Sequence, residues 1–294
     1  MSDVSFLSPK RLTRLNPQFD KYKMGSARLI SWLGGDGQNL RGALLLPSDY
    51  KEGKRYPLIV WPYAGANLSH SFTIFGLAGQ GPLNMQLLAT RGYGVLLPDS
   101  PQRLGSPMLD LAKTVLPGVN KVIEMGMADP DRLGVFGHSN GGYSVLGLIV
   151  QTDRFRAAVE ADGTADLIAA YGQMDRNGTA FFTSLLESGL DGLGGTPWQV
   201  PTRYMENSPL FYLDRVKTPL LLAHGSEDTT VAPFLAGEIY VAMRRLGKEV
   251  EYARYNGESH SPLDWTYDDQ MDFCSRVINW FDAHLKGSSV NGSN

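Results

Sequence analysis

One stretch in the middle of the chain, residues 133–142, most constrains what this sequence can fold into. It reads Leu-Gly-Val-Phe-Gly-His-Ser-Asn-Gly-Gly. An apolar run typical of a buried strand ends in Gly-x-Ser-x-Gly, and a helical pattern begins at once. A sharp turn of this kind holds its serine in a strained backbone conformation with the hydroxyl exposed. The pattern therefore predicts that Ser139 sits at a strand-to-helix turn above a β-sheet.

Small residues and a helix N-terminus surround the predicted turn. The turn is expected to leave no room for a side chain at Gly137 or Gly141, because a side chain at either position would collide with the neighbouring strand or helix. After the turn, apolar residues recur at helical spacing, so the helix buries one face and holds Ser139 at its N-terminus. That end of a helix presents free N–H groups, which suit a developing oxyanion. The alternative is a glycine-rich turn that contains a serine by chance.

Strand and helix patterns alternate along most of the chain, and this alternation indicates the fold class. Two strand patterns flank an Asp-Gly turn near the N-terminus and predict a β-hairpin. The later apolar runs and amphipathic helices predict an α/β fold with a doubly wound, mostly parallel sheet. The expected strands are 27–33, 40–46, 56–61, 94–98, 133–136, 157–161, 219–223 and 250–255, and the expected longer helices are 109–127, with a kink or break at Pro117, 232–246 and 268–285.

The patterns divide the chain into one main domain with short flanking segments. Residues 1–26 are polar and basic with little periodicity, and they predict an irregular surface arm. Residues 27–285 are expected to form a single domain, since no repeat period or linker divides them. Inside it, residues 162–215 form a glycine-rich insertion of the kind that often makes a lid or pocket wall. The tail, 286–294, is expected to be disordered.

A serine hydroxyl is a poor nucleophile near neutral pH, so Ser139 needs a general base and an acid that orients the base. Two polar loops follow later apolar strands and supply both. The first contains Asp228, with Glu227 as the competing acid, and the second contains His260. Both loops leave the carboxyl ends of their strands, the edge at which open α/β sheets place their sites. The order Ser, Asp, His is that of the α/β-hydrolase fold.

Other histidines are predicted to have supporting roles. His224 ends a buried strand and is expected to support the Asp228 loop, whereas His138 is expected to point away from the substrate side. The chain has no His-Glu-x-x-His motif and no paired cysteines, so we expect no metal site and no cofactor.

A tetrahedral intermediate also needs hydrogen-bond donors for its oxyanion. One expected donor is the backbone N–H of Asn140, at the start of the helix after Ser139. The other is expected from the loop after the strand 56–61, which reads Pro-Tyr-Ala-Gly at 62–65 rather than the His-Gly-Gly common in lipases and esterases.

These residues together resemble the catalytic domain of the prolyl oligopeptidase (S9) family of serine peptidases, over about residues 27–285. In that family the tyrosine after the strand donates its hydroxyl to the oxyanion, a role that falls on Tyr63 here. The resemblance implies a triad of Ser139, Asp228 and His260. The similar segments are 62–65, 137–143, 224–228 and 257–260, which read Pro-Tyr-Ala-Gly, Gly-His-Ser-Asn-Gly-Gly-Tyr, His-Gly-Ser-Glu-Asp and Gly-Glu-Ser-His.

Two departures from the family pattern bear on substrate choice. Family members usually carry a β-propeller before the catalytic domain that filters substrates by size, and these 294 residues have no room for one. Proline-cleaving members also place aromatic residues in the segment that follows the strand after the elbow. Here residues 162–167 contain none, which implies no preference for proline.

Composition restricts the partners. A net charge of −3 and a pI near 6.0 do not favour binding to nucleic acid or to an anionic membrane. No apolar run approaches the length of a membrane span and the N-terminus is not signal-like, so the expected compartment is the cytoplasm. The expected partner is a small ester or short-peptide substrate.

The sequence thus predicts a serine hydrolase that cleaves carboxylic esters, short peptides or both through an acyl-enzyme on Ser139. An alternative is the catalytic fragment of a propeller-bearing oligopeptidase or aminopeptidase. A further alternative, from another class of protein, is a catalytically silent α/β-hydrolase scaffold that serves as a binding module.

Overall fold

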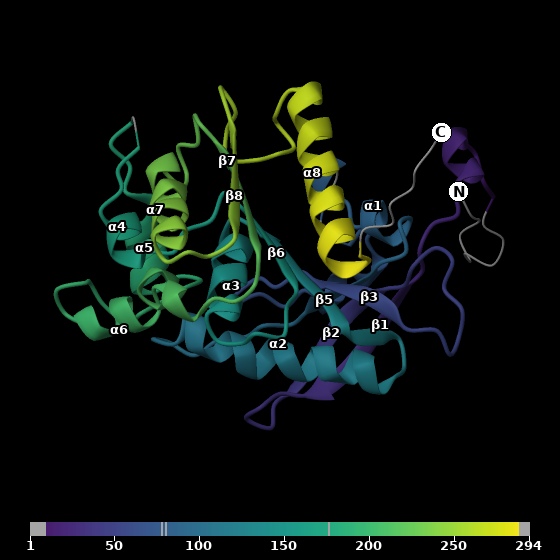
Figure 1. The fold of residues 1–294 in the computed structure, drawn as a ribbon, viewed down its shortest axis with the longest axis horizontal. Helices are drawn as coiled ribbons and strands as arrows, with labels where there is room; N and C mark the ends of the chain where they lie inside the picture. The colour runs from purple at the N-terminus through teal and green to yellow at the C-terminus, as the bar shows by residue number, and fades with distance from the viewer. Residues whose placement is uncertain (1–9, 78, 80, 176, 288–294) are drawn as a thin grey trace.

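The computed structural model describes residues 10–77, 79, 81–175 and 177–287. In this part of the chain, one sheet has the strand order β1-β2-β4-β3-β5-β6-β7-β8 (Figure 1). The strands are β1 (Ala27–Leu33), β2 (Asn39–Leu45), β3 (Tyr56–Val60), β4 (Gly94–Pro98), β5 (Ala128–His138), β6 (Ala157–Ala161), β7 (Leu220–Gly225) and β8 (Val250–Tyr255).

Strand direction agrees with the sequence pattern. β1 and β2 form the predicted antiparallel hairpin, and β2 also pairs antiparallel with β4. From β4 to β8 every neighbouring pair is parallel. The carboxyl ends of β3, β5, β6, β7 and β8 therefore meet at one edge of the sheet. The predicted doubly wound, mostly parallel α/β sheet with an N-terminal hairpin is confirmed.

Alternate residues along each strand face two separate cores. In β3, for example, Leu58 and Val60 join one core whereas Ile59 joins the other. Helices α2, α3 and α7 pack on the first face and α1 and α8 on the second, and Figure 1 shows α2 and α8 on opposite sides of the strands. These helices are α1 (Gln86–Ala89), α2 (Pro107–Glu124), α3 (Asn140–Ile149), α7 (Pro233–Arg245) and α8 (Tyr267–Leu285).

Of the two alternatives at Pro117, a kinked helix or two shorter helices, the second is wrong, because α2 runs as one continuous helix across Pro117. Proline removes one backbone donor, and the Lys113 carbonyl that loses it accepts the N–H of Gly35 at 2.8 Å instead. One residue further on, the carbonyl of Thr114 accepts the indole N–H of Trp32 at 3.2 Å. The hairpin thus supplies a donor to the one carbonyl that Pro117 leaves without its helical partner.

The insertion at 162–215 is more ordered than its composition indicates. Its described residues, 162–175 and 177–215, form three short α-helices and one 3₁₀ helix, Pro209–Arg215. Asn207 fixes it to the domain, because its side chain accepts from the N–H of Met108 at 3.0 Å and donates to the carbonyl of Gly105 at 3.1 Å. Of two adjacent phenylalanines in the insertion, Phe182 is buried and Phe181 is exposed. The α-helices are α4 (Leu167–Tyr171), α5 (Phe181–Glu187) and α6 (Pro201–Glu206).

The flanking segments are only partly described. The predicted arm is irregular from residue 10 onward except for a 3₁₀ helix, Pro17–Lys21, and its first nine residues lie outside the described part. Most of the predicted tail, 288–294, also lies outside it. No described helix is both long and apolar enough to cross a membrane.

Candidate active site

Ser139 occupies the sharp turn between β5 and α3. Its φ of 59° and ψ of −124° are strained for a residue with a side chain. The N–H of Ser139 donates to the carbonyl oxygen of Ala161 at 2.8 Å and so ties the turn to β6. The Ser139 hydroxyl makes no capping hydrogen bond to α3, which leaves it available to face His260.

Two glycines permit this turn. A Cβ atom at Gly137 would overlap the carbonyl of Gly141. A Cβ atom at Gly141 would lie 3.1 Å from the carbonyl oxygen of Pro62 and 3.4 Å from the ring of Tyr63. The glycines therefore allow the helix start to approach both its own strand and the loop after β3.

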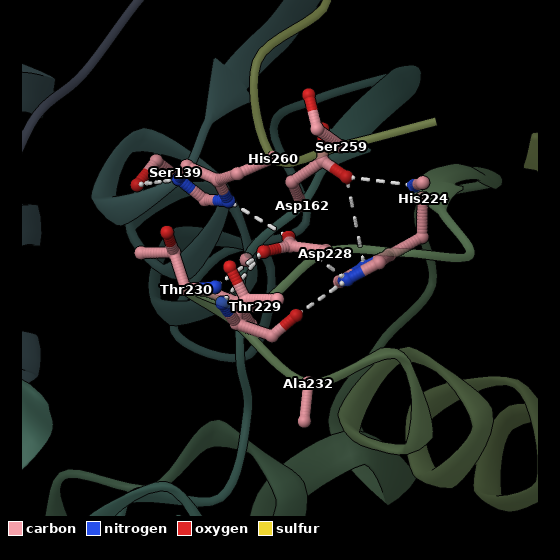
Figure 2. Close-up of polar contacts among 12 residues, drawn as sticks. Ser139, Asp162, His224, Asp228, Thr229, Thr230, Ala232, Ser259 and His260 are labelled. Carbon is pink, nitrogen blue, oxygen red and sulfur yellow. Dashed lines mark hydrogen bonds and ion pairs between the residues drawn. The ribbon is translucent and has the colours of Figure 1, made fainter. Parts of the chain in front are cut away.

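The loops after β7 and β8 bring two further polar side chains to Ser139. His260 Nε2 lies 2.9 Å from Ser139 Oγ, and His260 Nδ1 lies 2.7 Å from Asp228 Oδ2 (Figure 2). With the Nδ1 proton donated to Asp228, the Nε2 atom of a neutral imidazole is an acceptor for the serine hydroxyl. The structure thus joins the three residues that the sequence selected, from three different loops at one sheet edge.

Asp228, and not Glu227, contacts the imidazole. Asp228 is buried, whereas Glu227 is exposed. The Oδ1 atom of Asp228 accepts the backbone N–H groups of Thr230 at 2.8 Å and Val231 at 2.9 Å. These bonds orient the carboxylate so that its other oxygen faces His260.

Four donors keep Asp228 ionised. Besides His260 and the two backbone groups, His224 Nε2 lies 3.3 Å from Asp228 Oδ2. Burial alone raises the pKa of Asp228, but the hydrogen bonds from His224 and His260 outweigh burial and lower this pKa to about 2. A permanently charged Asp228 can hold the imidazole in one tautomer and stabilise its protonated form.

A buried charge network lies behind Asp228. His224 Nε2 is 2.9 Å from the carbonyl oxygen of Val231, and His224 Nδ1 is 4.0 Å from Asp162 Oδ1 (Figure 2). Burial lowers the pKa of His224, but the hydrogen bond to Asp228 and the charges of Asp162 and Glu160 outweigh it and raise this pKa to about 9. The raised pKa favours the protonated form of His224 between Asp162 and Asp228. The prediction that His224 supports the Asp228 loop agrees with this geometry.

No motif in the sequence points to Asp162, although it directly follows β6 at the same sheet edge as the other site residues. Its Oδ1 accepts the N–H of Gly225 at 3.0 Å. Asp162, His224 and Asp228 lie close enough together to share a metal ion. The Nε2 proton, however, faces the Val231 carbonyl and Asp228, so the contacts on that nitrogen are those of an ion-pair network.

Tyr63 and Asn140 lie close to Ser139: the Tyr63 side chain hydrogen-bonds Ser139, and Asn140 directly follows it in the chain. The side chain of Asn140 donates from Nδ2 to the carbonyl oxygen of Ala64 at 3.2 Å, and the N–H of Ala64 donates to Ser144 Oγ at 2.9 Å. These bonds fix the loop after β3 against α3. Burial and the nearby Asp191 charge raise the pKa of Tyr63, while its hydrogen bond with Ser139 lowers it, so the phenol stays protonated and can donate.

A cavity of about 180 Å³ opens beside Ser139. Its walls are mainly apolar, and most of the lining residues belong to the insertion. Among these, Phe181 and Phe182 supply aromatic rings that the segment 162–167 lacks. Tyr171 does not line it, because its hydroxyl bonds Glu187 and its ring packs on Trp198 and Tyr204. The lining residues are Tyr63, Ser139, Asn140, Tyr143, Gly163, Thr164, Leu167, Phe181, Phe182, Leu185, Leu186, Leu190, Asp191 and Val231.

The fold is that of the α/β-hydrolase class. Its eight-stranded sheet is mostly parallel, and the serine turn and the loops with Asp228 and His260 lie at the carboxyl edge of this sheet. The sequence profile of the prolyl oligopeptidase family matches residues 111–288. The chain therefore belongs to the prolyl oligopeptidase family.

Relatives share much of this chain but are longer. It is 28% identical over 291 residues to the uncharacterized peptidase YuxL of Bacillus subtilis, covering 94% of this chain and 42% of YuxL. It is 29% identical over 245 residues to the acylamino-acid-releasing enzyme of Arabidopsis thaliana, covering 80% of this chain and 31% of that enzyme. The chain thus spans less than half of the length of these relatives.

The fold is also found in solved structures. An acylaminoacyl peptidase of Pyrococcus horikoshii superposes with a TM-score of 0.79 at 24% identity, covering 97% of this chain and 46% of the other. An acylaminoacyl peptidase in complex with Z-Gly-Gly-Phe-chloromethyl ketone gives a TM-score of 0.79 at 25% identity, covering 95% and 45%.

Proposed function

We propose that this protein is a serine hydrolase that cleaves carboxylic esters or short peptides through an acyl-enzyme on Ser139. The observation that carries the proposal is the hydrogen-bonded series Ser139 Oγ, His260 and Asp228, which ends at the apolar cavity. The proposed catalytic domain comprises residues 27–285, with 162–215 as the wall of the substrate pocket. Membership of a family with named peptidases supports the same class of reaction.

The proposed reaction has two halves. His260 Nε2 takes the hydroxyl proton as Ser139 Oγ attacks the substrate carbonyl, and it returns that proton to the departing alcohol or amine. Water then attacks the acyl-enzyme, again with His260 as general base. Asp228 holds the imidazole and stabilises its positive charge in both halves.

The proposed oxyanion donors are the hydroxyl of Tyr63 and the backbone N–H of Asn140. Tyr63 faces the cavity next to Ser139, and Asn140 begins α3, where backbone N–H groups are free. Two donors held in advance of the reaction stabilise the developing charge without reorganisation.

A fluorophosphonate probe followed by intact-mass analysis tests the proposal. The expected result is a single adduct that is absent from Ser139→Ala and reduced in His260→Ala. A folded wild-type protein that acquires no adduct and hydrolyses no p-nitrophenyl ester would instead favour a non-catalytic binding scaffold.

The length of the relatives favours a second candidate, in which these residues act as the catalytic part of a larger oligopeptidase or aminopeptidase. The chemistry at Ser139 is the same in both cases. The two candidates are distinguished by comparing the hydrolysis of a short peptide with that of a longer peptide that contains it. A size-filtering domain, when combined with these residues, would suppress cleavage of the longer peptide and leave cleavage of the short one.

A further inference from the structure

A carboxyl group lines the cavity beside Ser139, on a wall that is otherwise mostly apolar. Asp191 is only 4% exposed and belongs to the turn that follows α5. Backbone hydrogen bonds hold this turn, from Leu193 N–H to the Leu186 carbonyl at 2.7 Å and from Gly105 N–H to the Gly192 carbonyl at 2.8 Å. The carboxyl group is therefore fixed in place before any substrate arrives.

Asp191 has little compensation for its burial. Its Oδ1 accepts one hydrogen bond from Asn140 Nδ2, at 3.2 Å. Burial raises the pKa of Asp191 to about 7, the Asn140 hydrogen bond opposes this, and no positive side chain of the described residues contributes. Buried carboxylates are normally paired with a cation. This one faces a cavity large enough for one amino-acid side chain.

The cavity accepts the acyl part of a substrate. Its lining includes Ser139 and the proposed oxyanion donors Tyr63 and Asn140, but not His260. Because His260 must protonate the leaving group, the leaving group lies on the histidine side. The group that enters the cavity is therefore attached to the carbonyl that Ser139 attacks.

The position of Asp191 also affects the proposed reaction. Asp191 contacts Asn140 and its charge acts on Tyr63, so an unpaired carboxylate here opposes negative charge in the oxyanion hole. A substrate cation that pairs with Asp191 removes this opposition and gains affinity at the same time.

Building on the proposed function, we propose that Asp191 selects substrates whose acyl part carries a protonated amine. The amine belongs either to a basic side chain or to the free α-amino group of an N-terminal residue. The aliphatic stem contacts the apolar walls formed by Phe182 and Leu186, and the ammonium group pairs with the carboxylate.

Three thiobenzyl esters test the proposal and distinguish the two sources of the amine. They are Nα-acetyl-lysine, Nα-acetyl-norleucine, which has an uncharged aliphatic side chain, and norleucine with a free α-amine. We expect kcat/KM for one amine-bearing ester to exceed that for Nα-acetyl-norleucine by roughly 10²-fold. A preference for Nα-acetyl-lysine indicates a side-chain amine, and a preference for free norleucine indicates an α-amine.

Asp191→Asn keeps the size of the side chain and an oxygen for Asn140, so it removes mainly the charge. In this variant the preference should fall to about one, and kcat for Nα-acetyl-norleucine should rise, because the charge that opposes the oxyanion has been removed. Glu187→Gln is the matched control, because Glu187 lies on the same insertion and bonds Tyr171 outside the cavity. It should keep the wild-type preference. An equal loss for all three esters in Asp191→Asn, or a wild-type protein without a preference for amines, overturns the proposal.

A binding measurement separates this proposal from the proposed function. If the wild-type protein cleaves no ester and does not react with the fluorophosphonate, the hydrolase proposal fails. The proposal that Asp191 binds an amine can still be tested by ligand binding. n-Butylammonium should then raise the Tm of the wild-type protein and not that of Asp191→Asn, with n-butanol as the neutral comparison. Equal shifts in both proteins, or no shift in either, overturn the assignment of Asp191.

Discussion

His138 Nε2 lies 2.8 Å from the backbone carbonyl oxygen of His260, although the two residues are 122 positions apart in the sequence. Their rings are also in contact, with centroids 5.0 Å apart and an interplanar angle of 42°. Burial and the neighbouring His260 lower the pKa of His138 to about 4, so it stays neutral at physiological pH and donates to that carbonyl. The residue before the serine thus supports the backbone of the imidazole loop.

The three residues of the proposed triad should act as one unit. Ser139→Ala is expected to lower kcat for p-nitrophenyl butyrate by about 10⁶, and His260→Ala by a similar factor, because both residues serve the same proton transfer. The double variant should be no worse than either single variant. Circular dichroism and Tm serve as controls for folding, and additive losses would contradict a shared step.

The acid of the triad is tested by two isosteric substitutions in neighbouring positions. Asp228→Asn should lower kcat by roughly 10⁴, because the amide favours the wrong imidazole tautomer. Glu227→Gln should stay near wild-type activity, since Glu227 is exposed and Asp228 contacts His260. The reverse order of effects would assign the acid to Glu227.

Tyr63→Phe tests the proposed oxyanion donor by removing only the hydroxyl. We expect kcat to fall roughly 10²-fold with little change in KM, since the donor acts in the transition state. Tyr143→Phe is the comparison, because its hydroxyl bonds the Asn207 carbonyl at 2.9 Å and is a structural contact. A change confined to KM in Tyr63→Phe would mean that Tyr63 only packs beside the loop.

The protonated state of His224 predicts a pH dependence of stability. Its pKa is raised to about 9 in the folded protein against about 6.5 in an unfolded chain, so its contribution is complete below about pH 6.5 and is lost as the pH rises through 9. Over this window its loss should lower the free energy of unfolding by at most about 1.4 kcal/mol per pH unit. Urea titrations of wild-type protein and His224→Gln measure the slope, which should be smaller in the variant.

His70→Gln is the control for this pH dependence, because His70 is exposed and lies outside the network. It should keep the wild-type slope between pH 6.5 and 9. A wild-type stability that is constant over this range would show that His224 is not charged at neutral pH.

Substrate class is tested by comparing leaving groups with one protein preparation. Short-acyl p-nitrophenyl esters should have a higher kcat/KM than any peptidyl-anilide, because an amide nitrogen must be protonated by a well-placed His260 as it leaves. Among anilides, alanyl and prolyl substrates should differ by less than tenfold. A strong prolyl preference would indicate that Phe181 and Phe182 take the role that the segment 162–167 lacks.

The sequence by itself determined the sheet, its direction and the three positions that meet at its edge. Apolar periodicity is local, and the elbow at Ser139 and the polar loops at Asp228 and His260 each directly follow a strand pattern. Parallel strands place their carboxyl ends together, so strand order along the chain already brings such loops to one edge.

Only the tertiary structure decided the features that depend on contacts between distant segments. The Lys113 carbonyl of α2, which Pro117 cannot serve, accepts a hydrogen bond from Gly35 of the distant hairpin. Phe182 is buried in the folded insertion, where it lines the cavity beside Ser139. In the sequence, Asp191 resembles an ordinary loop aspartate in a glycine-rich stretch. Its carboxyl group becomes a candidate amine-binding group only because folding buries it beside Asn140. Desolvation depends on which segments pack together, and local sequence does not encode that.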